Sequence, residues 1–432
     1  MRVATLLVTL LSALVTTTLV AQNMNTSNLT TSPYTRYGYG RLSGLGNSVT
    51  RSMGDVGIAL RSNQYTVLAN PASLTAIDTL TCIFTVGLDA QFGTYTEGST
   101  SNRKWNAGFS GMSFQVPLMR NFAMSLSFTP YSSIGYYYGT LDSIAVQSPT
   151  VKHDTLAYSS THDGEGGINN FMIGIGWRAL HSKRQELNLG VNAGWLFGSI
   201  DHGVDLVTST QATGTYVDYY ADIRGLFLQF GAQYTYRWGK GYDQSLTLGA
   251  TFSPKLNLSA DTEMLKYSGD SITITDEFRN DTKLPMSYGV GLTYSIARKL
   301  TLSAEYECAR WSQVMGLNSQ LEEQAGLYND THRFSVGAEY QPRTFTNNYF
   351  KLCRYRAGFS YRTNYVKAGA SDLHELGATL GMSLPIRRTS LDLGFGYNSL
   401  RPSQGSMVKE DYFSITLGLT FNESMFFRAR LH

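Results

Sequence analysis

Residues 187–197 read LNLGVNAGWLF, and apolar residues alternate there with small or polar ones. The apolar residues all fall on one parity: Leu187, Leu189, Val191, Ala193, Trp195 and Phe197. The other parity holds Asn188, Gly190, Asn192 and Gly194. Because successive side chains of a strand point to opposite faces, this period of two predicts a β-strand with one apolar face and one polar face.

The same alternation returns along the chain from Leu80 onward, and turn-forming residues interrupt it at regular intervals. We assign fourteen strands, over residues 80–96, 104–117, 121–138, 166–180, 186–200, 216–238, 244–260, 283–297, 300–314, 332–342, 355–367, 375–386, 389–400 and 410–425. An even number of antiparallel strands brings both ends of a barrel to one side of a membrane. The pattern therefore predicts an all-β fold, a 14-stranded antiparallel transmembrane β-barrel.

The connections between these segments differ in length. Three are short turns, at residues 119–121, 297–299 and 387–388, whereas longer polar stretches lie at 139–165, 261–282 and 315–331. Short periplasmic turns and longer outer loops are typical of bacterial outer-membrane barrels. We therefore expect the longer stretches to be loops on the cell surface.

The composition agrees with a membrane barrel. Hydrophobic residues make up 42% and aromatic residues 12% of the chain, with 28 Tyr and 42 Gly. After the N-terminal region, no run reaches the ~20 apolar residues that a membrane-spanning helix requires. A net charge of +3 without a basic cluster gives no reason to expect nucleic-acid binding. We expect the protein in the cell outer membrane of a Gram-negative bacterium, in contact with outer-membrane lipid.

The first residues predict export. Met1 and Arg2 precede an apolar run over residues 3–20, which gives way at once to Asn- and Thr-rich sequence. These features are typical of a cleavable signal peptide over residues 1–21, although Leu19 is bulkier than the residue usually found there. Residues 22–79 lack the strand pattern and are too few to bury a core alone, so we expect an N-terminal tail and hatch that fills the barrel lumen. The barrel itself is expected over residues 80–432.

Charged residues of the later strands fall on the parity opposite to the apolar residues. They are Glu305, Glu307, Glu339, Arg356 and Arg362. An Arg or Lys that faced lipid at the membrane midplane would cost ~2–4 kcal/mol, so these side chains are expected to face the lumen. Acidic and basic groups on neighbouring strands favour a structural lining of ion pairs, and contact with a substrate is the alternative.

Several motifs together resemble the long-chain fatty acid transporter family of FadL/TodX type. Gly44-Leu45-Gly46, a Gly-rich stretch over 54–59 and Asn70-Pro71-Ala72 precede the first strand in the family's order. The likeness continues at SFTPYSS (127–133), KLPMSYGVGLTY (283–294) and EYECARWSQ (305–313), and the tail SPYTRYGYG (32–40) is similar to Bacteroidetes variants.

The resemblance implies fourteen strands, a hatch that contains both motifs, and passive uptake of a hydrophobic small-molecule ligand. It also implies an irregular third strand that opens toward lipid. Pro130 lacks a backbone donor, so we expect broken hydrogen bonding around residues 129–133 and a lateral opening at Pro130, Tyr131 and Ser132. In the hatch, Pro71 fixes its own backbone and Asn70 can bond its own main chain, which favours a structural turn over ligand contact.

Two other function classes are considered. A barrel of this kind can act as an accessory subunit of an outer-membrane protein secretion or assembly complex, because fold does not decide function. An enzyme is not expected, since the only dense group of candidate residues, His162-Asp163-Gly164-Glu165, lies in a stretch expected to be a Gly-rich outer loop. We expect no cofactor and no metal site, and unpaired cysteines at Cys82, Cys308 and Cys353.

Overall fold

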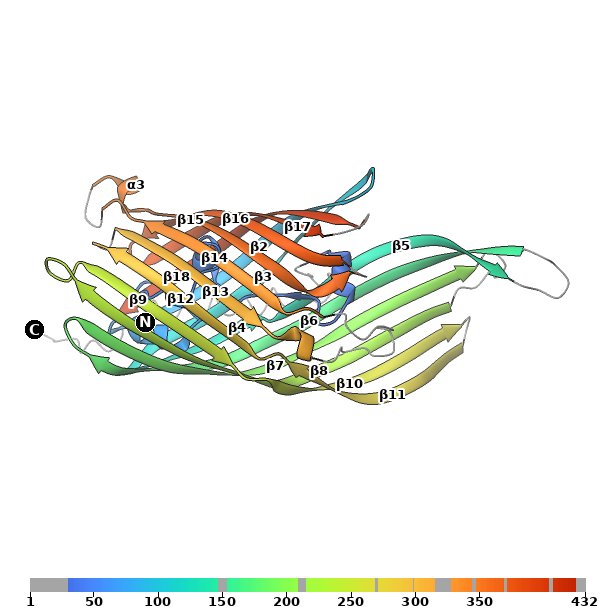
Figure 1. Cartoon of the computed structure of the whole chain (residues 1–432), viewed down its shortest axis with the longest axis horizontal. Helices are drawn as coiled ribbons and strands as arrows, with labels where there is room; N and C mark the ends of the chain where they lie inside the picture. The colour runs from blue at the N-terminus through green and yellow to red at the C-terminus, as the bar shows by residue number, and fades with distance from the viewer. Residues whose placement is uncertain are drawn as a thin grey trace, which may run out of the picture.

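The computed structural model describes residues 30–146, 154–208, 215–268, 271–297, 299–314, 328–343, 347–368, 371–403 and 407–424. The expected signal peptide and the last eight residues lie outside this part of the chain. The described residues form a closed, 14-stranded antiparallel β-barrel, which confirms the predicted fold (Figure 1). No helix in the described part is long and apolar enough to cross a membrane.

Three of the fourteen crossings are each built from two strands that follow one another with a short interruption. These pairs are β4 (Phe122–Pro130) with β5 (Ser132–Val146), β9 (Gln244–Ser253) with β10 (Leu256–Ser268), and β11 (Ser271–Leu284) with β12 (Ser287–Ile296). The other crossings are β2 (Thr81–Glu97), β3 (Thr100–Met119), β6 (Asp154–His181), β7 (Gln185–Thr208), β8 (Thr215–Trp238), β13 (Leu300–Ala309), β14 (Thr331–Tyr340), β15 (Arg354–Ala368), β16 (Ser371–Ile386), β17 (Thr389–Pro402) and β18 (Lys409–Ser424). Pairing of β18 with β2 closes the barrel, with Leu417 opposite Leu88.

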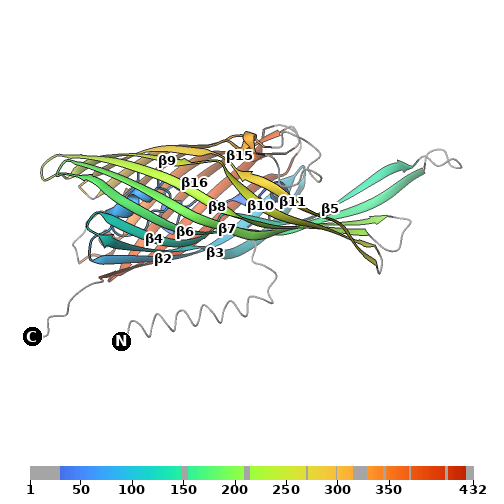
Figure 2. The same cartoon turned by 90° about the horizontal axis from the view of Figure 1, so that it is seen from below.

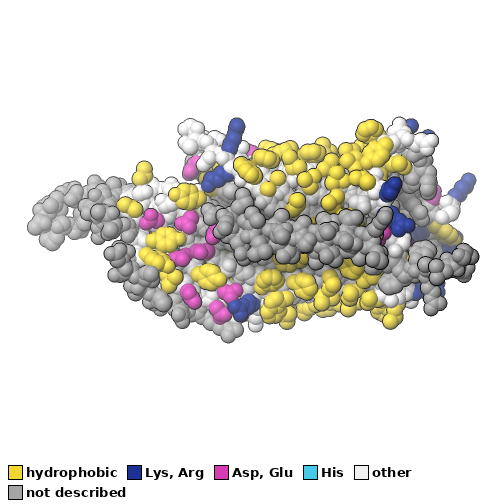
Figure 3. Space-filling view, turned by 180° about the vertical axis from the view of Figure 1, so that it is seen from behind, with side chains coloured by type: hydrophobic (Ala, Val, Ile, Leu, Met, Phe, Trp, Pro, Cys, Tyr) yellow, Lys and Arg dark blue, Asp and Glu magenta, His cyan; other side chains and the backbone are white. Residues whose placement is uncertain are grey.

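The apolar parity of the strands faces outward. On β7, Trp195 is 47% exposed, whereas Asn188 and Asn192 of the opposite parity are buried. Val290 and Leu380 on other strands are likewise exposed. Figure 3 shows hydrophobic side chains covering the body of the barrel. This is the reverse of a soluble protein and is the surface that a lipid bilayer requires.

The strands of the barrel wall are much longer on one side of the barrel than on the other. β6 has 28 residues and β7 has 24, whereas β13 and β14 have ten each. A crossing of the bilayer takes about 9–11 residues, so the long strands continue well beyond the membrane. We call these continuations of β5, β6, β7, β8, β10 and β11 the projecting sheet (Figures 1 and 2).

The projecting sheet corrects one expectation from the sequence. Most of residues 139–165 and 261–282, expected as loops, belong to strands β5 and β6 and strands β10 and β11. Each stretch pairs with a neighbouring strand, as Thr140 does with Ser160, so hydrogen bonding extends the sheet through Gly-rich sequence. The end opposite the projecting sheet carries the short turns, and we therefore assign the projecting sheet to the cell exterior.

Residues 30–79, here called the N-terminal segment, lie inside the barrel (Figure 1). The segment contains only short elements: η1 (Pro33–Arg36), β1 (Arg41–Leu42), α2 (Ser48–Arg51) and η2 (Pro71–Ala76). Two further short elements lie between later strands, η3 (Trp311–Gln313) and α3 (Tyr349–Leu352). Cys82, Cys308 and Cys353 are free and buried.

Candidate functional site

The lumen holds most of the candidate residues, and Asn70 is fixed there by hydrogen bonds on all sides. It is the N-cap of η2, where its side-chain oxygen accepts from the Ala72 amide at 3.0 Å. Its Nδ2 donates to the Ile58 carbonyl at 2.7 Å and reaches the carbonyls of Ala232 and Ala250 in the wall at 3.3 Å. The Asn70-Pro71-Ala72 motif therefore forms a turn that is attached to β8 and β9.

Glycines of the wall allow this close approach. A Cβ on Gly190 would lie 2.5 Å from the backbone carbon of Pro71, and a Cβ on Gly358 would overlap the Gly54 amide nitrogen. Only a residue without a side chain fits against the backbone of the N-terminal segment at these two positions. Part of the Gly content that suggested a barrel thus serves the contact between the wall and the N-terminal segment.

The other predicted hatch motif, Gly44-Leu45-Gly46, surrounds the Asp55 carboxylate. A Cβ on Gly44 or on Gly46 would meet that carboxylate. Gly44 and Leu45 also border the cavities of the lumen. The motif therefore lies next to a charged group of the N-terminal segment.

Glu305 and Glu307 meet at Arg333, a residue that the sequence analysis did not select. Arg333 contacts Glu307 at 2.7 Å, Asp55 at 2.9 Å and Glu305 at 3.3 Å. The Glu305 carboxylate also accepts from the amides of Gly57 and Ile58, at 2.8 and 2.9 Å. Arg333 lies opposite Glu307 in the β13–β14 pairing, so the parity rule that selected Glu339 would also have found it.

Arg356 and Arg362 join different groups. Arg356 is buried and contacts Glu339 at 2.7 Å, the Ser383 hydroxyl at 2.6 Å and Asp392 at 3.7 Å. Arg362 contacts Glu375 of β16 at 2.5 Å, rather than a carboxylate of β13 or β14. The five predicted residues therefore belong to three separate groups of charges and not to one network.

Four ion pairs connect the N-terminal segment with four different wall strands. They are Arg41–Glu375 at 3.1 Å, Asp55–Arg333 at 2.9 Å, Arg61–Glu186 at 2.7 Å and a contact between Arg51 and Asp89. Burial lowers the pKa of Arg61 to about 10, although Glu186 favours its charged form. Sequence reasoning missed these pairs because residues 22–79 follow no strand parity that predicts where each side chain points.

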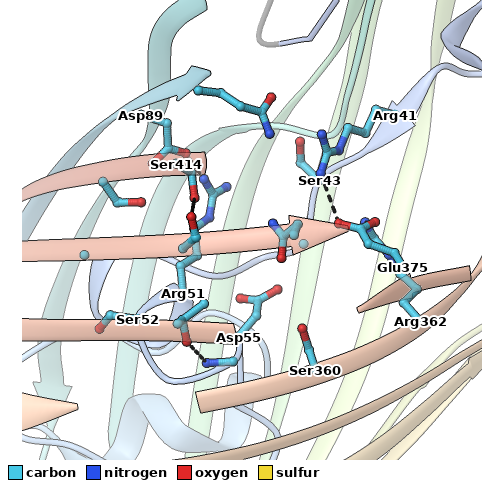
Figure 4. Close-up of a pocket in the computed structure, with 18 of the residues that line it drawn as sticks. Arg41, Ser43, Arg51, Ser52, Asp55, Asp89, Ser360, Arg362, Glu375 and Ser414 are labelled. Atoms are coloured by element: carbon cyan, nitrogen blue, oxygen red, sulfur yellow. Dashed lines mark hydrogen bonds and ion pairs between the residues drawn. The ribbon is translucent and has the colours of Figure 1, made fainter. Parts of the chain in front are cut away.

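Several cavities remain between the N-terminal segment and the wall, and two of them border Gly44. The first, of about 210 Å³, is bordered by charged side chains that point toward a common space, among them Arg41, Arg51, Asp55, Asp89 and Glu375 (Figure 4). The second, of about 190 Å³, has apolar walls that include Leu42, Leu45, Tyr131, Phe227, Leu256 and Trp311. Arg333, Arg362, Glu307 and Asp55 also line this second cavity.

The third crossing is interrupted at Tyr131, between β4 and β5. The pairing of β3 with β4 reaches only to Met112 and Phe128, and β5 pairs with β6 and with β1. Within the described residues, no pairing joins β3 to β5. Pro130 and Ser132 flank this interruption, beside the N-terminal segment.

Residues 162–165 lie in strand β6 and not in a loop as expected. His162 is near Ser160 and the Tyr138 ring, whereas Asp163 alternates to the opposite face. The alternation separates the two side chains, so this group does not form a catalytic arrangement. In the described residues, no group of three or more His, Cys, Asp or Glu is placed to hold a metal ion.

A family model described as BamG matches residues 4–432, nearly the whole sequence. The chain belongs to the BamG family. No curated protein matches it.

Solved structures of similar fold are distant in sequence from this BamG-family protein. A FadL homologue of Pseudomonas aeruginosa is 13% identical, with a TM-score of 0.56 over 90% of this chain and 100% of that chain. The Pseudomonas putida toluene transporter TodX is 15% identical, with a TM-score of 0.53 over 89% and 99% of the two chains. The Ralstonia pickettii toluene transporter TbuX is 17% identical, with a TM-score of 0.51 over 88% and 98%. At these identities the likeness shows the fold, and the protein is an outer-membrane barrel.

Proposed function

We propose that this BamG-family protein is an accessory subunit of an outer-membrane protein assembly complex. The observation that carries the proposal is the lumen, in which ion pairs and hydrogen bonds attach the N-terminal segment to the wall on many sides. The family name BamG points to an assembly complex and supports the same conclusion. In this role the barrel is a rigid support, and its projecting sheet offers surface to partners outside the cell.

The strength of the attachment favours a fixed segment over a moving gate. Glu186 is buried and meets Arg61 at 2.7 Å and Arg178 at 3.3 Å. Withdrawal of Arg61 would leave Glu186 with Arg178 and Arg237 of the wall, so the expected cost is smaller than the cost of about 3–5 kcal/mol for a buried charge that loses its one partner. Withdrawal of the N-terminal segment would break this pair together with those of Arg41, Arg51 and Asp55.

The size of the cavities supports the same conclusion. Pockets for drug-sized ligands are about 300–1,000 Å³. The two cavities beside Gly44, of about 210 and 190 Å³, are smaller, and seven charged side chains line the first. A third cavity, of about 410 Å³ between residues 63–65 and the wall, falls in this range, but polar and charged side chains such as Arg354, Arg356 and Asp392 make up most of its lining. The lumen therefore offers little dry volume to a long-chain amphiphile.

Depletion of the protein in its native bacterium tests the proposal. We expect other outer-membrane barrels to be inserted less efficiently, with uptake of labelled hydrophobic compounds unchanged. We also expect the affinity-tagged protein to be purified from gently solubilised membranes with other proteins at a fixed ratio. Normal barrel insertion together with purification as a lone chain would contradict the proposal.

A second candidate, uptake of hydrophobic small molecules, rests on the second cavity. Its walls are largely apolar, it reaches Tyr131 at the interruption of the third crossing, and its charges could meet a carboxylate. Under this proposal, the purified protein binds a fatty acid, and Tyr131 and Leu42 contact the acyl chain. A Leu42→Asp variant should then lose binding while Leu118→Asp, at the exposed end of β3, retains it. Binding that is equal in both variants would count against uptake through this cavity.

A further inference from the structure

The projecting sheet ends in two free edges that differ in sequence. At one edge, β11 pairs with β10, and the described part of β13 ends at Ala309, before it can cover β11. At the other edge, β5 pairs with β6, and the pairing of β3 with β4 stops before β5 begins. Exposed strand edges carry unpaired N–H and C=O groups and readily accept another strand.

The lower part of the β5 edge is covered by groups of this chain. β1 pairs Arg41 with Ser133, and the Thr35 hydroxyl lies 3.3 Å from both the amide and the carbonyl of Gly135. Lys104 donates to the Tyr137 carbonyl at 3.2 Å. The outward backbone groups therefore belong to residues 133, 135 and 137, and the alternation places those of Gly139 and Leu141 on the same edge.

The upper part of this edge, residues 139–146, is uncovered by any described strand. β5 continues to Val146 while its only partner there is β6. A stretch of this length is typical of a complete strand pairing in globular proteins. On the outer face beside it, Tyr137 is 66% exposed and Leu141 is 89% exposed. The uncovered edge is thus long, regular and flanked by exposed apolar side chains.

The two edges also differ in the features that prevent unwanted pairing. β11 contains Asp276, Glu277, Arg279, Asp281 and Lys283, and its pairing with β10 is interrupted by a bulge at Met264 and Leu265. Charges and bulges of this kind keep the edge strands of natural proteins from pairing with strands of other chains. β5 reads SSIGYYYGTLDSIAV, with Asp142 as its single charged residue and a regular pairing to β6 from Ile134 to Val146. The β5 edge lacks the protection that the β11 edge has.

The outer face beside this edge is acidic. On β6, β7 and β8 it carries Asp163, Glu165, Asp201, Asp205, Asp218 and Asp222, against the single cation Arg224. Figure 3 shows acidic side chains gathered at the projecting end. Glu165 lies directly opposite Asp201, an arrangement that destabilises a sheet. A partner that covers this face would therefore present basic side chains.

We propose that β5 accepts a strand from a partner protein along residues 139–146, with basic side chains of that partner lying over the acidic outer face. The short β1–β5 pairing at the base of the same edge shows that the edge geometry suits strand addition. Main-chain hydrogen bonds would supply affinity, and Tyr137 and Leu141 would contact alternate side chains of the added strand. The inference rests on the proposed role as a complex subunit and names the surface that binds.

Two variants of one residue test the backbone contact. Gly139→Pro removes the outward amide, whereas Gly139→Ala keeps it, and an added Cβ meets only ordinary contacts, at 3.7 Å to the Ser160 carbonyl. We expect Gly139→Ala to co-purify as much partner as the unchanged protein does. With Gly139→Pro, the amount of co-purified partner should fall at least tenfold. The shift of the folded barrel on unheated gels checks that both variants fold.

A photo-crosslinking residue in place of Leu141, with one in place of lipid-facing Leu380 as control, identifies the contact. Mass spectrometry should map the Leu141 product to one extended, basic segment of the partner that co-purifies, and this product should vanish in Gly139→Pro. Full retention of the partner by Gly139→Pro, or a product with a second copy of this chain, would overturn strand addition while the complex itself stands. Absence of any stoichiometric partner from the unchanged protein would instead refute the proposed function.

Discussion

Inside the barrel, three buried or half-buried carboxylates have cations beside them: Glu305 has Arg333, Glu339 has Arg356 and Glu375 has both Arg41 and Arg362. On the outer face of the projecting sheet, by contrast, carboxylates of β6, β7 and β8 greatly outnumber the one cation, Arg224. The first arrangement satisfies its own charges and fixes the N-terminal segment. The second leaves an excess of negative charge on the described outer face of these strands. Pairing within the lumen thus fixes the N-terminal segment, and the imbalance on the projecting sheet supports the partner proposed above.

The largest expected effect comes from Arg333→Met. This change leaves Glu305, Glu307 and Asp55 without their shared cation, so we expect the free energy of unfolding to fall by about 3–5 kcal/mol. Denaturant unfolding of the refolded barrel in lipid vesicles, followed by tryptophan fluorescence, measures it. Arg224→Met on the projecting sheet is the matched control and should unfold like the unchanged protein, because this exposed pair is well solvated. Equal losses for both variants would remove the distinction between the two regions.

Arg356→Met tests whether the loss of stability comes from the carboxylates that remain without a cation. Glu339 and Asp392 would remain in a buried place without their cation, and we expect a loss of about 3 kcal/mol in the same unfolding measurement. The double variant Arg356→Met with Glu339→Gln removes one of the orphaned charges and should recover part of the loss. A double variant that is less stable than the single one would show that lost packing, rather than charge, is responsible.

Gly358→Val tests the close approach of wall and N-terminal segment. The added side chain would meet the Gly54 amide and the Met53 backbone, so we expect a loss of about 1–3 kcal/mol from overpacking. Gly139→Ala serves as the control on the projecting sheet, where the added Cβ finds only ordinary contacts. Limited proteolysis from the periplasmic side should also cut the N-terminal segment faster in Gly358→Val. An unchanged cleavage rate would mean that the segment adapts without leaving the wall.

The smallest expected effect on the free energy of unfolding is a gain rather than a loss. Asp201→Asn removes one of two like charges that face each other across β6 and β7, so we expect the barrel to gain about 0.2–1 kcal/mol. Glu305→Gln in the lumen is the comparison and should lose stability, since its carboxylate accepts two backbone amides and contacts Arg333. A loss of stability in Asp201→Asn would show that the acidic face is satisfied within the chain.

The alternation of residues was enough to predict the barrel, its number of strands and the lipid-facing parity. It could not predict the height of the wall, because Gly-rich stretches such as HDGEGG (162–167) suggest turns when read alone. Their strand conformation depends on pairing with β5 and β7, which is information from distant parts of the chain.

In the lumen, side-chain directions could be predicted for residues of the wall strands but not for residues of the N-terminal segment. Parity placed Glu305, Glu339 and Arg356 on the inner face, yet Arg333, the cation beside Glu305, was passed over. The contacts of Arg41, Arg51 and Arg61 depend on an irregular segment, in which no period relates sequence to direction. The roles assigned to the two hatch motifs, to Pro130, Tyr131 and Ser132, and to the lumen charges therefore remain predictions.

The contacts of the N-terminal segment also constrain the order in which the protein folds. Ser32 donates to Glu410, 378 residues later, and the Gly57 amide donates to Glu305, 248 residues later. The N-terminal segment therefore reaches its full set of partners only after almost all strands, β18 included, are synthesised. Contacts so remote in sequence form slowly. Ordering of the N-terminal segment is thus expected late in folding, and until then the polar groups of the wall that it pairs, such as the Glu305 and Glu410 carboxylates, lack these partners.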